Sequence, residues 1–98
     1  MLSKKQRLSA SEVREIIKSG RSARAATLSA KFLPAKEGKA AVVVSAKVAK
    51  TAVLRNRLRR AAYQTLRTAL PQHTQVVFFL HKPVLDPAEL KALCLKLS

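Results

Sequence analysis

Apolar positions recur along this chain with two different periods, and the changes between these periods predict its elements. Ser9 and Glu12 form a capping box ahead of apolar residues at the i, i+3, i+4 spacing of one helix face. Gly20 stands where a helix C-cap is expected. A short helix is therefore predicted over residues 10–19, with one face packed against the rest of the protein.

The pattern then changes to a period of two. Residues 27–32 alternate polar and apolar side chains up to Pro34, which is typical of a half-buried strand. Residues 40–48 are β-branched and nearly continuously apolar, as in a strand that is buried on both faces. Because the segment "PAKEGK" between them has turn composition, the two strands are predicted to form a hairpin.

A second helix is predicted over residues 51–70, where the period returns to 3.6 and Pro71 ends the pattern. The arc predicted to face the core holds Leu54, Leu58, Ala61, Ala62, Thr65 and Ala69. The opposite arc holds Asn56, Arg57, Arg60, Tyr63, Gln64 and Arg67, and the apolar stripe is flanked by Arg55 and Arg59. This second helix therefore turns a strongly basic face towards solvent.

The last two elements complete a simple order. Residues 75–80, "QVVFFL", predict a buried strand, and Asp86, Pro87 and Glu89 supply the cap, first-turn proline and N3 acid of a final helix. The order is α-β-β-α-β-α, and its strand–helix–strand unit predicts a mixed sheet. We expect one α/β domain over residues 1–98, an α+β two-layer sandwich with helices covering one face of the sheet.

Charge adds a functional constraint. The 98 residues carry 20 Lys and Arg against five acids, a formal charge of +15, and no acid lies between residues 38 and 85. A polyanion must neutralise this segment, and nucleic acid and anionic lipid are the two candidates. No apolar run approaches a membrane span and the N-terminus lacks a signal peptide's apolar core, so we expect a cytoplasmic protein without a membrane partner.

Enzymatic chemistry is hard to find in the sequence. The one combination to test is Cys94 with His73 and His81, but Cys94 lies on a leucine-rich helix face, as a buried apolar residue would. The histidines lack partners at metal-ligand spacing, the five acids are scattered, and the two glycines form no phosphate loop. We expect no catalytic residue, no metal site and no cofactor bound by the protein.

The basic helix predicts binding to phosphates. Its arginines have no acid to offset their mutual repulsion, and the planar guanidinium pairs bidentately with phosphate and stacks on bases. Tyr63 on the same predicted face is suited to stack on an unpaired base. A DNA-reading helix would present Asn or Gln repeatedly, and only Asn56 and Gln64 qualify, so no DNA partner is expected.

Two motifs carry a resemblance to a known family. The segments "KVAK" (47–50) and "RNRLRR" (55–60), which lead a helix out of the strand "VVVSAK", resemble the signature of the bacterial ribonuclease P protein subunit. The similarity extends over nearly the whole chain, from "QRL" (6–8) and "KSGR" (18–21) to the last helix.

The resemblance implies a ribosomal-protein-S5-like fold with a left-handed βαβ crossover, against the general right-handed preference. It also implies a non-catalytic subunit of the ribonuclease P holoenzyme, an endoribonuclease in tRNA processing. The partners would be the ribonuclease P RNA and precursor tRNA. The RNA subunit, with Mg²⁺, would remove the 5′ leader.

The resemblance also assigns residues. The positions matched to RNA binding, with two added from the same helix face, are Lys47, Lys50, Arg55, Asn56, Arg57, Arg59, Arg60, Tyr63 and Arg67. Candidates for a cleft that holds the single-stranded leader, between the first helix and the sheet, are Val13, Ile17, Leu28 and Phe32. The family commonly has phenylalanines where Val13 and Ile17 stand. It often has an arginine where Tyr63 stands, and Arg67, one turn later on the same helix face, would take over the phosphate contact of that arginine.

Two further functions stay open on the sequence alone. A ribosomal or assembly protein could share this fold and charge and would bind ribosomal RNA. An autonomous protein nuclease would need a metal or acid–base set that the sequence does not supply.

Overall fold

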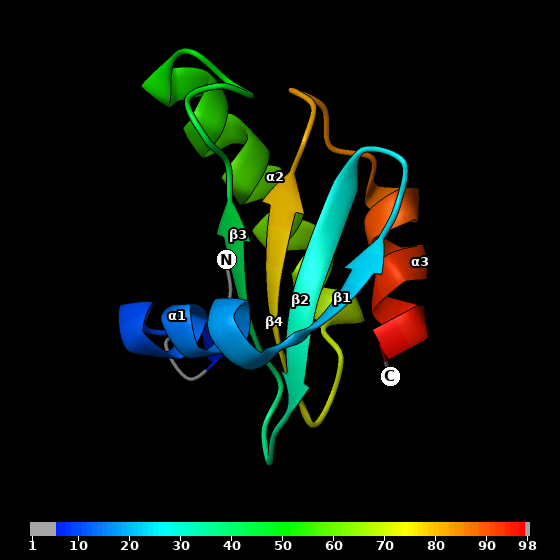
Figure 1. Ribbon diagram of the computed structural model, residues 1–98. Helices are drawn as coiled ribbons and strands as arrows, with labels where there is room; N and C mark the ends of the chain where they lie inside the picture. Colours follow the sequence, from blue (N-terminus) through cyan, green and yellow to red (C-terminus); the bar gives the residue numbers. More distant parts are fainter. Residues whose placement is uncertain (1–5, 98) are drawn as a thin grey trace.

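The six predicted elements are present in the predicted order, and the structure adds one short strand after the first helix. The computed structural model describes residues 6–97 (Figure 1). Its elements are α1 (Ala10–Ser19), β1 (Arg21–Arg24), β2 (Leu28–Pro34), β3 (Lys39–Val43), α2 (Ala52–Ala69), β4 (Thr74–Leu80) and α3 (Pro87–Leu97).

The helix ends follow the capping signals in the sequence. In α1 the Ser9 side chain accepts a hydrogen bond from the Glu12 backbone N–H, and Glu12 accepts one from the Ser9 N–H, which closes the capping box. Thr51 caps α2 by accepting from the Leu54 N–H at 3.2 Å. Asp86 similarly accepts from the Ala88 N–H at the start of α3.

The four strands form one mixed sheet in the order β1-β2-β4-β3. β2 runs antiparallel to both β1 and β4, whereas β3 runs parallel to β4. The predicted hairpin between β2 and β3 is therefore wrong, because β4 lies between them. The partner of β2 in the observed hairpin is β1, whose polar sequence "RSAR" carries no strand pattern.

β3 is also shorter than predicted. It ends at Val43, and the chain then makes a turn in which the N–H groups of Val48 and Ala49 donate to the Ser45 carbonyl. Lys47 and Lys50 are consequently placed on a loop that leads directly into α2.

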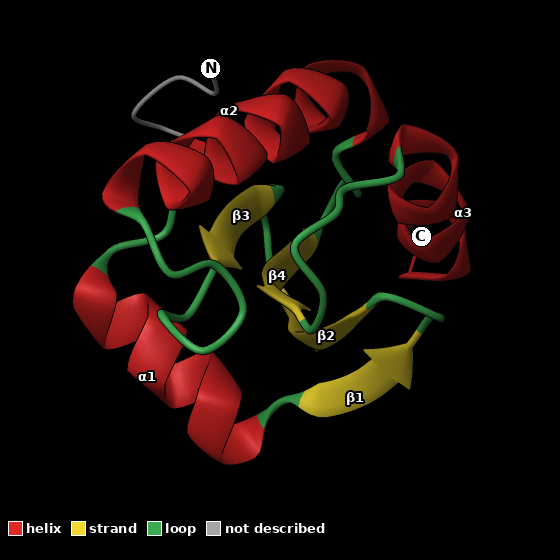
Figure 2. Ribbon diagram, turned by 90° about the horizontal axis from the view of Figure 1, so that it is seen from above, coloured by secondary structure: helices red, strands yellow, loops and turns green. Residues whose placement is uncertain are grey.

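The β3–α2–β4 connection is left-handed, as the family resemblance implies. In Figure 1 both strands run upward with β4 to the right of β3, and α2 descends behind the sheet. Figure 2 places α2 and α3 on one side of the sheet and α1 on the other. Helices therefore cover both faces, and the prediction that they cover one face is wrong. A right-handed crossover, the general preference, would put α2 on the side of α1.

The main core lies between the sheet and the pair α2 and α3. Alternate residues of β4 point into it, with Val76 fully buried and Phe78 and Leu80 nearly so. α2 contributes Leu58, and α3 contributes Leu93. α1 packs on the opposite face, against β2 and β4, and buries Ile16 there.

Candidate nucleic-acid interface

The outer face of α2 and the loop before it carry exposed basic side chains. This group consists of Lys47, Lys50, Arg57, Arg60 and Arg67, and the exposed Asn56 lies among them. Within residues 6–97 the single ion pair joins Lys39 to Glu12 at 3.3 Å, so none of the five cations is paired with a carboxylate there. The five therefore form a surface on which positive charge is not compensated, and we call it the basic face.

Arg55 differs from the other arginines of the motif. It is half-buried, and its Nη1 donates to the Ala49 carbonyl at 2.9 Å and to the Lys50 carbonyl at 3.4 Å. These bonds tie the first turn of α2 to the loop that holds Lys47. Arg55 was predicted to bind RNA, and the structure also places it as the residue that positions this loop.

Asn56 and Arg59 are joined by a hydrogen bond in which the Arg59 Nη2 donates to the Asn56 Oδ1. Both side chains line a hollow of about 360 Å³ between α2 and the edge strand β3, together with Val42, Arg60 and Tyr63. Since arginine and amide groups converge on one concavity, the hollow is suited to hold an anionic or polar group.

Tyr63 lies at a different place from the one predicted. Its side chain is half-buried, packs against the core, and its hydroxyl accepts a hydrogen bond from the Val42 backbone N–H at 3.1 Å. The helix is rotated relative to the prediction, because the fully buried Leu66 belongs to the core-facing arc and brings Tyr63 towards β3. Tyr63 thus satisfies a donor on the open edge of the sheet.

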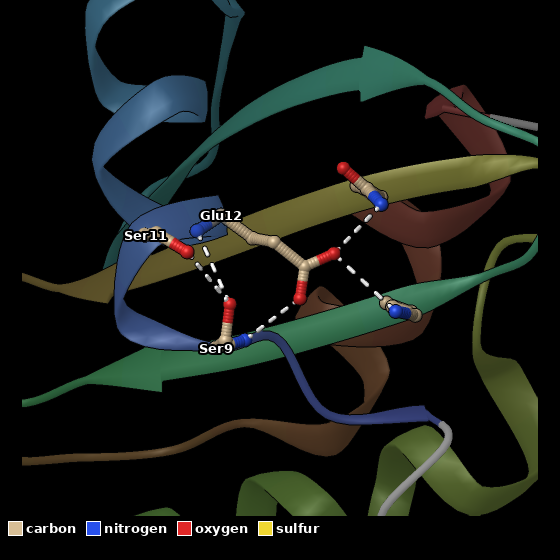
Figure 3. Close-up of polar contacts among 5 residues, drawn as sticks. Ser9, Ser11 and Glu12 are labelled. Carbon is tan, nitrogen blue, oxygen red and sulfur yellow. Dashed lines mark hydrogen bonds and ion pairs between the residues drawn. The ribbon is translucent and has the colours of Figure 1, made fainter.

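On the other side of the sheet, polar contacts fix α1 in place. Glu12 Oε2 accepts from Lys39 Nζ at 3.3 Å and from Gln75 Nε2 at 3.2 Å, which joins α1 to β3 and β4 (Figure 3). Lys31 Nζ donates to the Ile17 carbonyl at 3.1 Å near the other end of the helix. α1 is therefore held at both ends against one face of the sheet.

The backbone N–H of Ser9 is the main group that lowers the pKa of Glu12. Burial, the second-largest effect, acts in the opposite direction, and the Ser9 hydroxyl and the ammonium of Lys39 lower this pKa further. Because the carboxylate stays ionised, it neutralises Lys39, which is therefore not part of the basic face.

The leader-cleft residues predicted from the sequence fall on two different faces. Val13 is half-buried and Ile17 is 41% exposed, and both lie on α1, so their place in a leader cleft stays a prediction. Leu28 is fully buried in the core under α2 and α3, and Phe32 packs against the same core. Leu28 and Phe32 therefore face away from α1 and do not line a cleft there.

Sequence reasoning missed the residues of β2 and β4 that share the face of α1. In β2 these are Ser29, Lys31 and Leu33, and in β4 they are Gln75, Val77 and Phe79. The alternation of residues 27–32 could have separated the two faces, but the half-buried strand that it predicts turns its polar residues towards solvent and not towards a helix. The run "VVFFL" gave no alternation, so neither phenylalanine was assigned to a face.

The residues considered for nucleophilic chemistry lie apart. Cys94 is buried in the core between α2 and α3, and burial raises the pKa of its thiol to about 11. His81 lies on the other side of the sheet, where its Nε2 is 2.7 Å from the Ser29 hydroxyl. In the described residues, no three His, Cys, Asp or Glu side chains gather as a metal-ligand set.

A helix that crosses a bilayer needs about 20 predominantly apolar residues. None of the helices within residues 6–97 is both long enough and apolar enough to cross a bilayer.

Comparison with known proteins identifies the family. The family model described as Ribonuclease P matches residues 2–97. Among solved structures, the RNase P protein of Staphylococcus aureus is 18% identical with a TM-score of 0.74, and the match covers 94% of each chain. The RNase P protein of Thermotoga maritima is 21% identical with a TM-score of 0.74 and 93% of each chain covered. The comparison with curated proteins finds no match.

The structural likeness agrees with the mixed sheet and the order of helices described above. Since the family model spans nearly all of the sequence, the chain belongs to the ribonuclease P protein family.

Proposed function

We propose that this chain binds the catalytic RNA of ribonuclease P through the basic face and assists removal of the 5′ leader from precursor tRNA. The observation that carries the proposal is the uncompensated charge of that face, on a helix with no acid within it. A solvated helix face normally mixes signs, because like charges at i, i+4 repel each other. Bound phosphates would supply the missing negative charge and would release counterions from the RNA.

The second contact of the proposal is with the precursor. The surface formed by α1 and the neighbouring strands would hold the single-stranded leader, with Val13 and Ile17 on the helix side. Of the cations on the same sheet face, Lys31 and Arg24 would bind leader phosphates, whereas Lys39 is neutralised by Glu12.

The chemistry itself would belong to the RNA. No side-chain constellation described above is suited to activate water, and the five cations of the basic face are suited to bind phosphate. Magnesium ions held by the RNA subunit would supply the activated water and stabilise the leaving oxygen. The protein would meet both RNAs in the cytoplasm.

A competition experiment tests this RNA specificity. Labelled bacterial ribonuclease P RNA is titrated with the protein, and unlabelled ribonuclease P RNA or a 16S ribosomal RNA fragment of equal length is added as competitor. We expect the ribonuclease P RNA to compete far more effectively than the ribosomal fragment at physiological salt. Equal competition would leave only non-specific phosphate binding, and stronger competition by the ribosomal fragment would favour a ribosomal role.

A further inference from the structure

α1 covers only part of the sheet face on which it lies. In Figure 1 it crosses the lower half of the sheet, and the upper parts of the strands stay clear of it on the near side. The strand register divides this face into rows of side-by-side residues. One row contains Lys39, Gln75 and Leu33, the next contains Ala41, Val77, Lys31 and Ser22, and the third contains Val43, Phe79, Ser29 and Arg24.

The first two rows are engaged by α1. Lys39 and Gln75 bond to Glu12, Val77 is fully buried, and Lys31 bonds to the Ile17 carbonyl. The third row lies one residue pair further along the strands. Val43 remains 36% exposed there, and Phe79 is only half-buried although it lies on a central strand of the sheet.

Phe79 forms part of a hollow of about 320 Å³ on this open face. The hollow is shared by β1, β2 and β4, and Arg24, Ser29 and Lys31 line it around the ring. The Ser29 hydroxyl is held by His81 at 2.7 Å. No described carboxylate lines the hollow, and Glu12 and Glu89 are bonded elsewhere, Glu89 to the backbone N–H and hydroxyl of Thr27. The hollow therefore combines an aromatic floor with a positive rim.

This combination matches one class of ligand. An unpaired base can stack on an accessible ring, and the attached phosphate can bind an adjacent guanidinium, whereas the bases of a duplex are already stacked and paired. With strands about 4.8 Å apart, the row from Arg24 to Val43 is about 14 Å long, so an extended strand of RNA can lie across it. Beyond Val43 the chain leads within a few residues to Lys47.

We infer that Phe79 is the base-stacking platform for the single-stranded leader, with Arg24 binding a leader phosphate beside it. This inference rests on the proposed function and assigns the stacking contact to the sheet. α1 offers Val13 and Ile17, which have no ring, so on this face of the described chain Phe79 supplies the aromatic surface.

The test measures how much affinity the leader contributes. Holoenzyme is assembled from the protein and a bacterial ribonuclease P RNA, and Kd is determined under non-cleaving conditions for two precursor tRNAs. One carries a long unstructured leader and the other carries a leader of a single nucleotide. For Phe79→Ala we expect Kd for the long leader to rise about 5- to 150-fold, with Kd for the short leader unchanged.

Two further substitutions separate stacking from packing. Phe79→Trp keeps a ring and should bind the long leader as the unchanged protein does. Phe79→Leu keeps apolar volume without a ring and should lose affinity as Phe79→Ala does. Leu95→Ala is the matched control, because Leu95 is 76% exposed on α3, which lies on the other side of the sheet. If Phe79→Ala fails to fold, the difference in Kd for the long leader between Phe79→Leu and Phe79→Trp still tests whether the ring is needed.

Several outcomes would overturn the inference. Phe79→Leu with full affinity for the long leader would show that the ring is not needed, and an equal loss with both leaders would indicate damage to the protein. Both results leave the proposed subunit role intact. If the unchanged protein itself binds long and short leaders equally, the proposed leader contact fails, and the stacking assignment fails with it.

Discussion

Arg55 shows that neighbouring residues of one basic motif have different tasks. Arg57 and Arg60 point outward from α2, whereas Arg55 donates to the carbonyls of Ala49 and Lys50 and holds the preceding loop. The loop carries two of the five cations of the basic face. A charge in this motif can therefore act on RNA indirectly, by fixing where other charges lie.

Replacing Arg55 by Ala should lower both stability and RNA affinity. Loss of its carbonyl hydrogen bonds should cost about 1 kcal/mol in the free energy of unfolding, a value kept low because the side chain is half exposed. Urea denaturation and RNA titration of the same sample measure the two effects. Arg55→Lys keeps the charge but not the guanidinium geometry, so full recovery of RNA affinity by lysine would contradict the positioning role.

Tyr63 is expected to stabilise the protein without contacting RNA through its hydroxyl. Tyr63→Phe leaves the ring packed but removes the acceptor for the Val42 N–H, and it should lower the free energy of unfolding by about 0.5–1.5 kcal/mol. RNA affinity should not change. Unchanged stability together with weaker RNA binding would show instead that the hydroxyl serves the interface.

Glu12 gives α1 a pH-dependent attachment. Its folded pKa lies below the ordinary value of 4.5, so its contribution to stability is complete above that value and is lost as pH falls through the lowered folded pKa. Urea denaturation across this acidic window should show stability falling with pH. In Glu12→Gln that part of the fall should be absent, and an identical pH dependence in both proteins would refute the assignment.

At the scale of elements, the predictions from sequence were correct where interactions within a few residues determine the structure. The first and last helices were located by their caps, the Ser9 capping box and Asp86, and α2 was located by its period of 3.6 residues up to Pro71. Strand β1 was missed because its pairing with β2 comes from the connection between them, not from its own polar sequence.

The wrong predictions at this scale concern alternatives that the local sequence does not distinguish. A period of two separates the faces of β2 but does not say which face a given helix covers, so Leu28 and Phe32 were assigned to the wrong side. Which strand lies next to β2 is likewise decided by packing of the whole sheet. On α2 the omission of Leu66 rotated the predicted core arc away from Tyr63, although the basic face remained outward.

The basic face of α2 should bind RNA as a unit. Each phosphate neutralised adds about 0.7–0.9 to the slope of log affinity against log salt, so Arg57→Ala with Arg60→Ala should weaken binding and reduce the slope by about 1.4–1.8. Titrations over a salt series measure both quantities. Both residues are exposed, so thermal unfolding should be unchanged.

The control for this double variant removes the same charge elsewhere. Lys91→Ala with Lys96→Ala takes two exposed cations from α3, on a different helix of the same sheet face. An equal drop in affinity and slope in both double variants would mean that only net charge matters. A lowered unfolding temperature in the α2 variant would show that Arg57 and Arg60 contribute to the packing of the folded protein.

At the scale of the whole molecule, two candidate surfaces meet at one loop. β3 ends at Val43 on the open sheet face, and a few residues later the chain enters α2, with Lys47 and Lys50 between. Figure 1 shows this loop at the upper end of both elements. In the proposed role, one face of this small domain would hold a single strand while the adjoining helix contacts a folded RNA, and the charge of +15 would favour both contacts.

Cleavage of precursor tRNA tests the central claim most directly. A bacterial ribonuclease P RNA is assayed at low magnesium alone, with this protein, and with the Arg57→Ala, Arg60→Ala variant, and the protein alone serves as a control. We predict that the protein stimulates cleavage at the mature 5′ end, that the variant stimulates it much less, and that the protein alone cleaves nothing. Tight RNA binding without any stimulation would contradict the subunit role, and cleavage by the RNA-free protein would contradict the assignment of the chemistry to RNA.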